Sequence, residues 1–333
     1  MQKIINEPAA FVDESLDAIL SAHPDQLARS AQDPRAIIRS GTGRTGKVAI
    51  VTGGGSGHLP LFLGYVGHGL ADAVAVGNVF ASPSSEEILA ATRASDMDAG
   101  TLYLFGNYGG DSMNFAMAAE LAADEGIRIE TIKAADDVAS APREEAHRRR
   151  GIAGIFFLYK IAGAAAEAGL PLEEVAEVTR RASLNLRSIG VALAPCTVPA
   201  AGRPTFTVNA GEMEIGMGIH GEPGVRRAPL ESANDIADEL VAHISADMDL
   251  APADSVDVLV NGLGATPLEE LYILYGRTAK SLSARGVKIR RAWVGEYATS
   301  LEMAGASLSI LRTDSEIARL LDAPAQSPFL AIP

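Results

Sequence analysis

Cysteine is almost absent from this sequence of 333 residues, which contains Cys196 alone. A single cysteine cannot form an intramolecular disulfide, and it also excludes a metal site built from several cysteine thiolates. Long apolar runs are missing too: no stretch reaches the roughly 18–20 apolar residues of a membrane span. The N-terminus lacks the apolar core of a signal peptide. We therefore expect a cytoplasmic protein.

Basic residues are scarce relative to acidic ones, with 28 Lys and Arg against 42 Asp and Glu and a net charge of −14. Nucleic acids and anionic membranes require clustered basic side chains, so neither is an expected partner. The conspicuous basic run, residues 148–150, follows Glu144 and Glu145. This alternation of charge blocks predicts a solvated helix face. Hydrophobic residues make up 47% of the chain, which is typical of a folded globular protein.

The first half of the chain alternates between short β-branched runs and helical patterns. Ser84 with Glu87 three residues later forms a capping box that predicts the start of a helix ending near Ala94. Strands are predicted at 47–52, 73–80, 101–105 and 127–133, and further helices at 11–22 and 111–125. Strands separated by helical patterns of about 10–15 residues predict a parallel sheet with helices on its faces.

The predicted secondary structure changes near residue 186, from two helices to several short strands. Before it, residues 151–186 read as two helices with a break at 169–171. After it, strands are predicted at 188–196, 205–208, 213–219, 256–260, 289–294 and 307–311, and helices at 232–248, 267–285 and from 315. We predict an α/β protein of two domains. Residues 1–186 form a domain with a mostly parallel sheet flanked by helices, residues 187–333 form a smaller α+β domain, and the site lies in the cleft between them.

The first of three glycine-rich loops, residues 53–60 (GGGSGHLP), follows a predicted parallel strand. Open α/β sheets bind ligands at this end of their strands, and glycines let a backbone approach a small polar ligand. The loop lacks the Lys-Ser/Thr pair of a Walker loop. It also departs from the dinucleotide-binding fingerprint, although Asp72 lies near the distance expected of the ribose-binding acid. A purely structural strand-to-helix turn is the alternative for this segment.

The second loop, residues 107–111 (NYGGD), ends in a carboxylate where a helix begins. Aspartate is a preferred N-cap residue, so a structural cap is one interpretation of Asp111. A general base directed at a ligand is the other interpretation, and the local sequence does not decide between them.

The third loop, residues 216–224 (GMGIHGEPG), places His220 between glycines with a proline close behind. Most isolated histidines are structural. His220 differs because its neighbours are too small to bury it, and a rigid exposed turn is predicted there.

Together these segments resemble the substrate-binding subunit of the dihydroxyacetone kinases. The resemblance extends over nearly the whole chain and rests on many ordered motifs. They are found at residues 3–6, 53–58, 82–83, 107–111, 194–200, 218–224, 261–272 and 299–303.

The resemblance implies a mechanism that suits these residue types. His220 matches the histidine that adds to the substrate carbonyl and forms a hemiaminal, which selects ketoses over glycerol. Asp111 matches the base that removes the proton from the attacking hydroxyl, and His58 matches a second histidine that hydrogen-bonds the substrate. The family's substrate-contacting positions correspond to Gly55, Ser82, Gly106 and Asn107.

The resemblance also implies partners. The family places its nucleotide on an all-helical domain with two Mg²⁺ ions, and the 333-residue chain leaves no room for that domain. We therefore expect no cofactor or metal on this chain and ATP or ADP with Mg²⁺ on a separate helical subunit. That subunit exchanges ATP directly or is rephosphorylated by a phosphotransferase-system protein. A homodimer is also implied.

Three positions depart from the family pattern. Leu59 stands where Glu is common, Gly106 where Lys is common, and Gly109 replaces a bulkier residue. Loss of a long cationic side chain opens volume beside the ketose, so the hypothesis is a substrate such as the tetrulose erythrulose. Two other functions remain as alternatives: a ketose-binding sensor that signals to a transcription regulator, and a nucleotide-dependent dehydrogenase built on the first loop. The dehydrogenase fits poorly because its fingerprint is incomplete.

Overall fold

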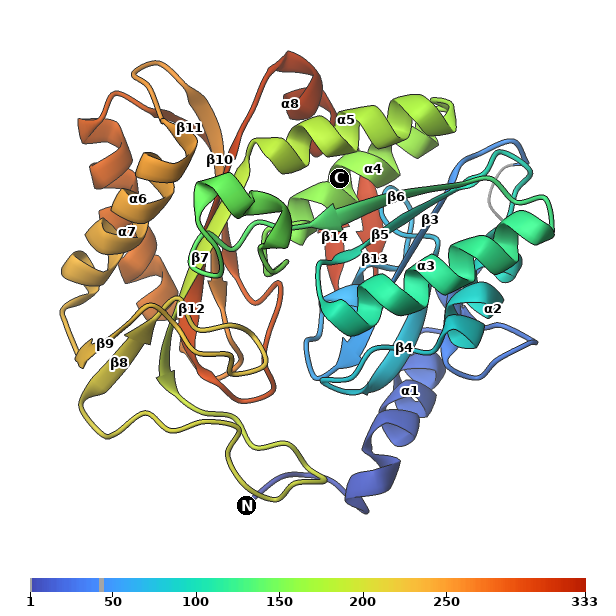
Figure 1. Ribbon diagram of the computed structural model, residues 1–333, viewed down its shortest axis with the longest axis horizontal. Helices are drawn as coiled ribbons and strands as arrows, with labels where there is room; N and C mark the ends of the chain where they lie inside the picture. Colours follow the sequence, from blue (N-terminus) through green and yellow to red (C-terminus); the bar gives the residue numbers. More distant parts are fainter. Residues whose placement is uncertain (1, 42–44) are drawn as a thin grey trace. The chain divides into compact units, whose positions relative to one another are not determined.

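The computed structural model describes residues 2–41 and 45–333 and divides the chain into two compact units (Figure 1). The first unit comprises the residues up to 133 together with 157–181 and 317–333, and the second comprises 134–156 and 182–316. The predicted boundary near residue 186 lies close to the crossing at 181–182. Each unit is nevertheless assembled from separate stretches of chain, which a single boundary does not describe.

The sheet of the first unit has six strands in the order β1-β2-β4-β3-β5-β6. Its central strand β3 pairs in parallel with both β4 and β5, which confirms the predicted parallel sheet. The antiparallel strands β1 and β2 form one edge and were not predicted, because they are only three and four residues long. The strand bounds are β1 Leu27–Arg29, β2 Ala36–Arg39, β3 Ala49–Ser56, β4 Ala73–Val79, β5 Thr101–Gly106 and β6 Ile129–Ala134.

The helices of the first unit begin and end close to their predicted positions. The capping box of α2 is present: the Glu87 backbone N–H donates to Ser84 Oγ at 3.2 Å, and Ser84 N–H donates to Glu87 Oε2 at 2.6 Å. Helices α2 and α3 bury aromatic and aliphatic side chains against the sheet, and Phe105 stacks on Phe115 at 4.0 Å between ring centroids. The bounds are η1 Pro8–Ala10, α1 Phe11–Ala22, η2 Phe62–Tyr65, α2 Ser85–Ser95, α3 Gly109–Asp124, α4 Ile155–Glu167, α5 Leu172–Leu184 and α8 Ser315–Asp322, with the hairpin β13 Ala325–Ser327 and β14 Leu330–Ile332.

The sheet of the second unit has the order β11-β10-β12-β7-β8-β9. Only the β10–β11 pairing among its described strand pairs is parallel, so the α+β prediction is confirmed. Helices α6 and α7 bury its aliphatic core. The bounds are η3 Arg143–Arg148, β7 Leu186–Ala194, β8 Glu212–Ile215, β9 Arg226–Pro229, α6 Ala233–Met248, β10 Ser255–Gly262, α7 Leu268–Ala284, β11 Lys288–Gly295 and β12 Ala304–Arg312.

One strand prediction for the second unit is wrong, and one strand was not predicted. Residues 205–208 are not a strand, and the edge strand β9 is found instead at Arg226–Pro229. The sequence of β9 contains two arginines and a proline, which are not typical of strands, so its residue pattern does not predict a strand. Its pairing with β8 depends on backbone hydrogen bonds rather than on a buried side-chain face.

The basic run at 148–150 is not the solvated face that its sequence predicts. Arg148 is exposed, but the side chain of Arg149 is 1% exposed and its Nη2 lies 2.5 Å from Asp247 Oδ2. Arg150 lies with its Nη2 2.7 Å from Asp137 Oδ2. The partner carboxylates lie 13 and 98 residues away in the chain, so local charge patterning could not reveal them.

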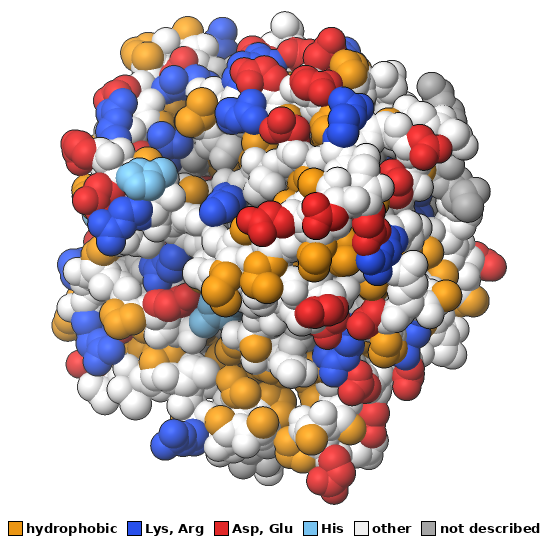
Figure 2. Space-filling view, turned by 45° about the vertical axis from the view of Figure 1, so that its right-hand side comes forward, with side chains coloured by type: hydrophobic (Ala, Val, Ile, Leu, Met, Phe, Trp, Pro, Cys, Tyr) orange, Lys and Arg blue, Asp and Glu red, His pale blue; other side chains and the backbone are white. Residues whose placement is uncertain are grey.

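On the face of the molecule seen in Figure 2, acidic and basic side chains are intermingled. On the face seen in Figure 2, blue and red side chains stand beside one another, and no extended basic area is visible among the described residues of that face. This agrees with the net charge of −14. No helix among the described residues is both long and apolar enough to cross a membrane.

Candidate functional site

Three loops of the first unit lie at one edge of its sheet. They follow β3, β4 and β5, which run parallel, so their carboxyl ends meet at the same edge. The loops approach closely. A Cβ added at Gly55 would lie 2.7 Å from the Ala81 nitrogen, and one at Gly110 would lie 2.6 Å from Ser82 Oγ. The neighbours at Gly55 are main-chain atoms, so the contact between loops requires glycine there, whereas at Gly110 the close neighbour is the hydroxyl of Ser82.

His58 is held by aromatic side chains. Its side chain is 1% exposed, and its ring stacks on Phe80 at 4.8 Å between centroids with an angle of 21°. Phe62 meets the same ring edge-on at 6.2 Å. These contacts fix the ring plane, so the predicted second histidine has one orientation at this edge of the sheet.

Asp111 is not the N-cap of its helix. The N-cap position of α3 is Tyr108, and Asp111 is the third helical residue, inside the first turn. It is buried, with 8% of its surface exposed. Burial raises the pKa of the Tyr159 phenol, and the negative charge of Asp111 raises it further. Asp111 therefore projects into the interior near Tyr159, where an N-terminal helix dipole favours a carboxylate.

The remaining predicted contacts of the first unit lie beside these two residues. Gly106 is buried at the end of β5, and Asn107 Oδ1 lies 3.4 Å from the Ser112 hydroxyl, which donates to it. Asn114 Nδ2 donates to the Pro83 carbonyl oxygen at 2.7 Å, which ties α3 to the loop that carries Ser82. The structure thus brings six predicted residues to one edge of one sheet: Gly55, His58, Ser82, Gly106, Asn107 and Asp111. Their roles stay predictions.

His220 lies in the second unit, on a turn after β8, and each unit is described by itself. The Gly221 N–H donates to the Gly218 carbonyl at 3.0 Å to close the turn, and the imidazole is 24% exposed. The prediction of an exposed turn is met in part, because the ring is half-buried. Ser300 Oγ donates to the Ile219 carbonyl and braces the turn from the segment 299–303.

Glu222 was missed by the sequence reasoning, although it stands two residues after His220. Its Oε1 lies 3.0 Å from His220 Nδ1, and its Oε2 accepts the His220 backbone N–H at 3.0 Å. Burial raises the pKa of Glu222, but the interactions with His220, a backbone hydrogen bond and the charge of Arg150 together outweigh burial and lower the pKa to about 2. Glu222 is therefore ionised at neutral pH. The sequence did contain a signal for this pairing, because Glu222 follows His220 by two residues in the same glycine-rich turn.

Cys196 is buried, and its Sγ lies 3.6 Å from Ser300 Oγ in the second unit. Over the described ranges, no group of three His, Cys, Asp or Glu side chains is arranged to hold a metal ion.

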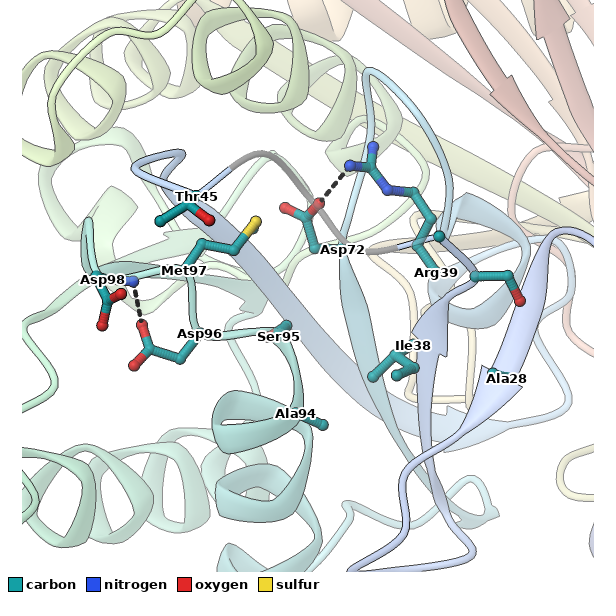
Figure 3. A pocket seen from close by; sticks show the side chains of 12 residues that line it. Ala28, Ile38, Arg39, Thr45, Asp72, Ala94, Ser95, Asp96, Met97 and Asp98 are labelled. Carbon is teal, nitrogen blue, oxygen red and sulfur yellow. Dashed lines mark hydrogen bonds and ion pairs between the residues drawn. The ribbon is translucent and has the colours of Figure 1, made fainter.

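A cavity of about 380 Å³ opens elsewhere in the first unit (Figure 3). Arg39 and Asp72 form one wall, with Arg39 Nη2 3.5 Å from Asp72 Oδ1, and residues 94–98 form another. Asp72 Oδ2 also lies 2.6 Å from the Lys47 ammonium, which is almost fully buried. The cavity contains none of the predicted site residues. Asp72 thus has a structural role as the buried partner of Lys47, and a ribose ligand is not needed to account for it.

A family model described as the Dak1 domain matches residues 17–329. The chain belongs to the dihydroxyacetone kinase family. It is 42% identical to the dihydroxyacetone-binding subunit DhaK of PTS-dependent dihydroxyacetone kinase 2 from Listeria innocua, over 100% of both chains. It is 45% identical to the D-erythrulose kinase of Mycolicibacterium smegmatis, covering 98% of this chain but 56% of that protein. The chain thus spans the full length of the DhaK subunit and about half of the erythrulose kinase.

Solved structures of the family agree with the fold. The dihydroxyacetone kinase of C. freundii superposes with a TM-score of 0.87 at 32% identity, covering 98% of this chain and 60% of that one. The dihydroxyacetone kinase operon co-activator DhaQ superposes with a TM-score of 0.89 at 33% identity, covering 96% and 98%. The family has therefore both kinase and co-activator members with this architecture.

Proposed function

We propose that this chain is the ketose-binding component of a dihydroxyacetone-type kinase. It binds a short-chain hydroxyketone covalently while a phosphoryl group is transferred from a nucleotide on another subunit. The observation that carries the proposal is the His220 turn. There, a partly exposed imidazole is hydrogen-bonded through Nδ1 to an ionised carboxylate, which leaves the lone pair of the ring on Nε2.

Capture proceeds by addition of Nε2 to the C2 carbonyl of the ketose. The bond between Nε2 and C2 forms, the carbonyl π electrons move onto oxygen, and that oxygen takes up a proton from solvent. The product is a hemiaminal whose ring, with hydrogen still on Nδ1, carries the positive charge. Glycerol has no carbonyl and cannot form this bond, so the step selects the substrate class. Covalent attachment also removes most of the translational freedom of the ketose before the transfer step.

Asp111 is the general base for phosphoryl transfer. It is buried within the first turn of α3, and it belongs to the same loop edge as His58 and Ser82. It takes the proton of the terminal hydroxyl as that oxygen attacks phosphorus, and His58 donates or accepts a hydrogen bond at the substrate. The proposal requires one ketose to reach both His220 and Asp111.

The phosphoryl donor belongs to a partner. ATP, or ADP that is rephosphorylated by a phosphotransferase-system protein, is held with Mg²⁺ on a helical subunit, and this chain acts as a homodimer. The support is that a relative matching this chain end to end is named as the DhaK subunit of a PTS-dependent kinase.

The substrate is a tetrulose such as erythrulose. Gly106 places no side chain beside the loop edge, where the family pattern has Lys, and Leu59 is 37% exposed at the position of the usual Glu. Erythrulose kinases from Mycolicibacterium smegmatis and Pectobacterium atrosepticum are 41–45% identical to this chain. A clear preference for dihydroxyacetone over erythrulose in kcat/KM, measured with the reconstituted partner, would disprove this assignment.

The central test separates capture from transfer. With a ketose labelled with ¹³C at C2, capture converts a carbonyl ¹³C NMR signal into that of a saturated carbon. His220→Ala is expected to abolish this signal change, whereas Asp111→Asn keeps it and lowers phosphorylation about 10²- to 10⁴-fold. His243→Ala is the matched control, because His243 is also a partly exposed histidine of the second unit paired with a glutamate. Capture by His220→Ala, or normal turnover by Asp111→Asn, contradicts the proposal.

A second function is favoured by one observation, the likeness to the operon co-activator DhaQ. A ketose sensor needs the capturing histidine but no base. Phosphorylation by the wild-type chain with its partner subunit supports the kinase. Capture without any turnover, together with ketose-dependent binding to a transcription regulator, identifies the sensor.

A further inference from the structure

The carboxylate of Glu222 holds two nitrogens of the same residue. Its Oε1 lies 3.0 Å from His220 Nδ1, and its Oε2 accepts the backbone N–H of His220 at 3.0 Å. One rigid group thus contacts both the ring and the main chain of His220, which restricts rotation of the imidazole. A carboxylate accepts hydrogen bonds and donates none, so the ring proton stays on Nδ1.

Arg150 stands behind this carboxylate. Its Nη1 lies 3.9 Å from Glu222 Oε2, its Nε donates to Asp137 Oδ2 at 3.0 Å, and its Nη2 donates to the Gly216 carbonyl at 3.1 Å. Asp137 is 1% exposed. Charges therefore alternate within the second unit from Asp137 through Arg150 to Glu222, and Glu222 in turn contacts His220.

The backbone leaves room for this row only because residue 218 is glycine. A Cβ there would lie 2.1 Å from Glu222 Oε2 and 2.6 Å from Arg150 Nη1. Gly218 also accepts the Gly221 N–H that closes the turn. The turn is thus built around the position of the carboxylate as well as around the histidine.

We infer that Glu222, held by Arg150, is a positioning residue for covalent ketose capture, which keeps His220 in the Nδ1–H form and balances the charge of the adduct. The inference rests on the proposed function. When Nε2 bonds to C2 while Nδ1 keeps its hydrogen, the ring becomes cationic. The carboxylate 3.0 Å away then forms a stronger, charge-assisted hydrogen bond with the adduct than with the neutral ring. The role suits an ionised group, and the pKa of Glu222 is lowered to about 2.

Glutamine cannot reproduce both contacts of Glu222. If its carbonyl oxygen accepts from Nδ1, its NH₂ group faces the backbone N–H of His220 and the Arg150 guanidinium, which are donors themselves. Glu222→Gln therefore retains the shape of the side chain while it removes the charge and one of the two acceptors.

The experiment measures capture and tautomer in the full chain. Capture of a ketose labelled with ¹³C at C2 is titrated by NMR for wild type, Glu222→Gln, Glu222→Ala and Arg150→Gln, and ring ¹⁵N shifts report which nitrogen of His220 carries hydrogen. The control is Glu231→Gln. Its carboxylate pairs with Arg226 and is 33% exposed, against 31% for Glu222.

We expect both Glu222 variants to bind the ketose about 10- to 100-fold more weakly, as expected for loss of a hydrogen bond to a charged group. The ¹⁵N shifts of the unliganded Glu222→Ala variant should show hydrogen moving toward Nε2. Arg150→Gln should weaken capture by a smaller factor, and Glu231→Gln should match wild type.

Wild-type capture and an unchanged tautomer in both Glu222 variants would overturn the inference. The inference would also be overturned if the Glu222 variants lost capture with an unchanged tautomer and a lowered unfolding temperature. That result would indicate that Glu222 only stabilises the fold. These results are distinguishable from failure of the proposed function, in which His220→Ala still captures the ketose or wild type captures none.

Discussion

Replacing Gly55 by alanine should disturb the site through its backbone. A Cβ at this position would lie 2.7 Å from the Ala81 nitrogen, 2.9 Å from Phe80 Cα and 3.0 Å from the Phe80 carbonyl carbon. Real Cβ atoms essentially never approach closer than 3.0 Å, and all three neighbours are main-chain atoms that cannot rotate away. The loop after β4 must therefore move away from β3, and Phe80 moves with it from its stack on His58.

The size of the effect follows from overpacking. Insertion of a methyl group into such a contact costs about 1–3 kcal/mol. For a domain of the size of the first unit each kcal/mol lowers the unfolding temperature by about 2–4 °C. A shift of several tenths of an ångström at His58 should also lower kcat/KM on the order of 10-fold, since misplacement by 1 Å can cost about 10²-fold.

The assay compares Gly55→Ala with Gly109→Ala, because both glycines belong to site loops. A Cβ at Gly109 meets nothing within 4 Å, and this residue opens α3, where alanine is favoured over glycine. We expect Gly109→Ala to keep or raise the unfolding temperature and to leave kcat/KM unchanged. If Gly55→Ala matched Gly109→Ala in both calorimetry and steady-state kinetics, the reasoning from loop contact would be refuted.

Three further predictions concern stability. Arg149→Met removes the buried partner of Asp247 and leaves this carboxylate with Arg187 alone, so it should cost about 1.5–3 kcal/mol in urea unfolding, whereas Arg148→Ala, at an exposed position, should stay within about 0.5 kcal/mol; equal costs would contradict the burial of Arg149. Because the folded-state pKa of Glu222 is lowered from 4.5 to about 2, its contribution to stability is present above pH 4.5 and is lost as pH falls toward 2. Unfolding free energies measured across that window should decline less steeply in Glu222→Gln, and an identical slope would show that the pairing with His220 is absent. Ser84→Ala removes the cap of α2 and should cost about 1 kcal/mol, with no change speaking against the capping box.

At Gly110 and Gly218, glycine leaves space for a polar side chain from a neighbouring segment. Gly110 admits Ser82 Oγ at 2.6 Å from where its Cβ would stand, and Gly218 admits Glu222 in the same way. In each case the glycine allows a polar side chain to approach a turn that carries a candidate catalytic residue. A search for glycines in loops finds these positions, but not the side chains that occupy the space.

Local sequence determined the elements whose causes lie within a few residues. The capping box of Ser84 and Glu87, the break between α4 and α5, and the strands that end in glycine loops were predictable because their hydrogen bonds and turns are local. The motifs at 53–58, 107–111 and 218–224 likewise identified the family and the residues to examine.

Only the tertiary structure decided which charges meet. Asp247 neutralises Arg149 from 98 residues away, and Asp111 proved to be a buried first-turn residue rather than a cap. The division of each unit into separate stretches of chain has the same origin. Burial and ion pairing depend on distances through space, which folding sets by joining segments far apart in the chain, and no local pattern of residues records them.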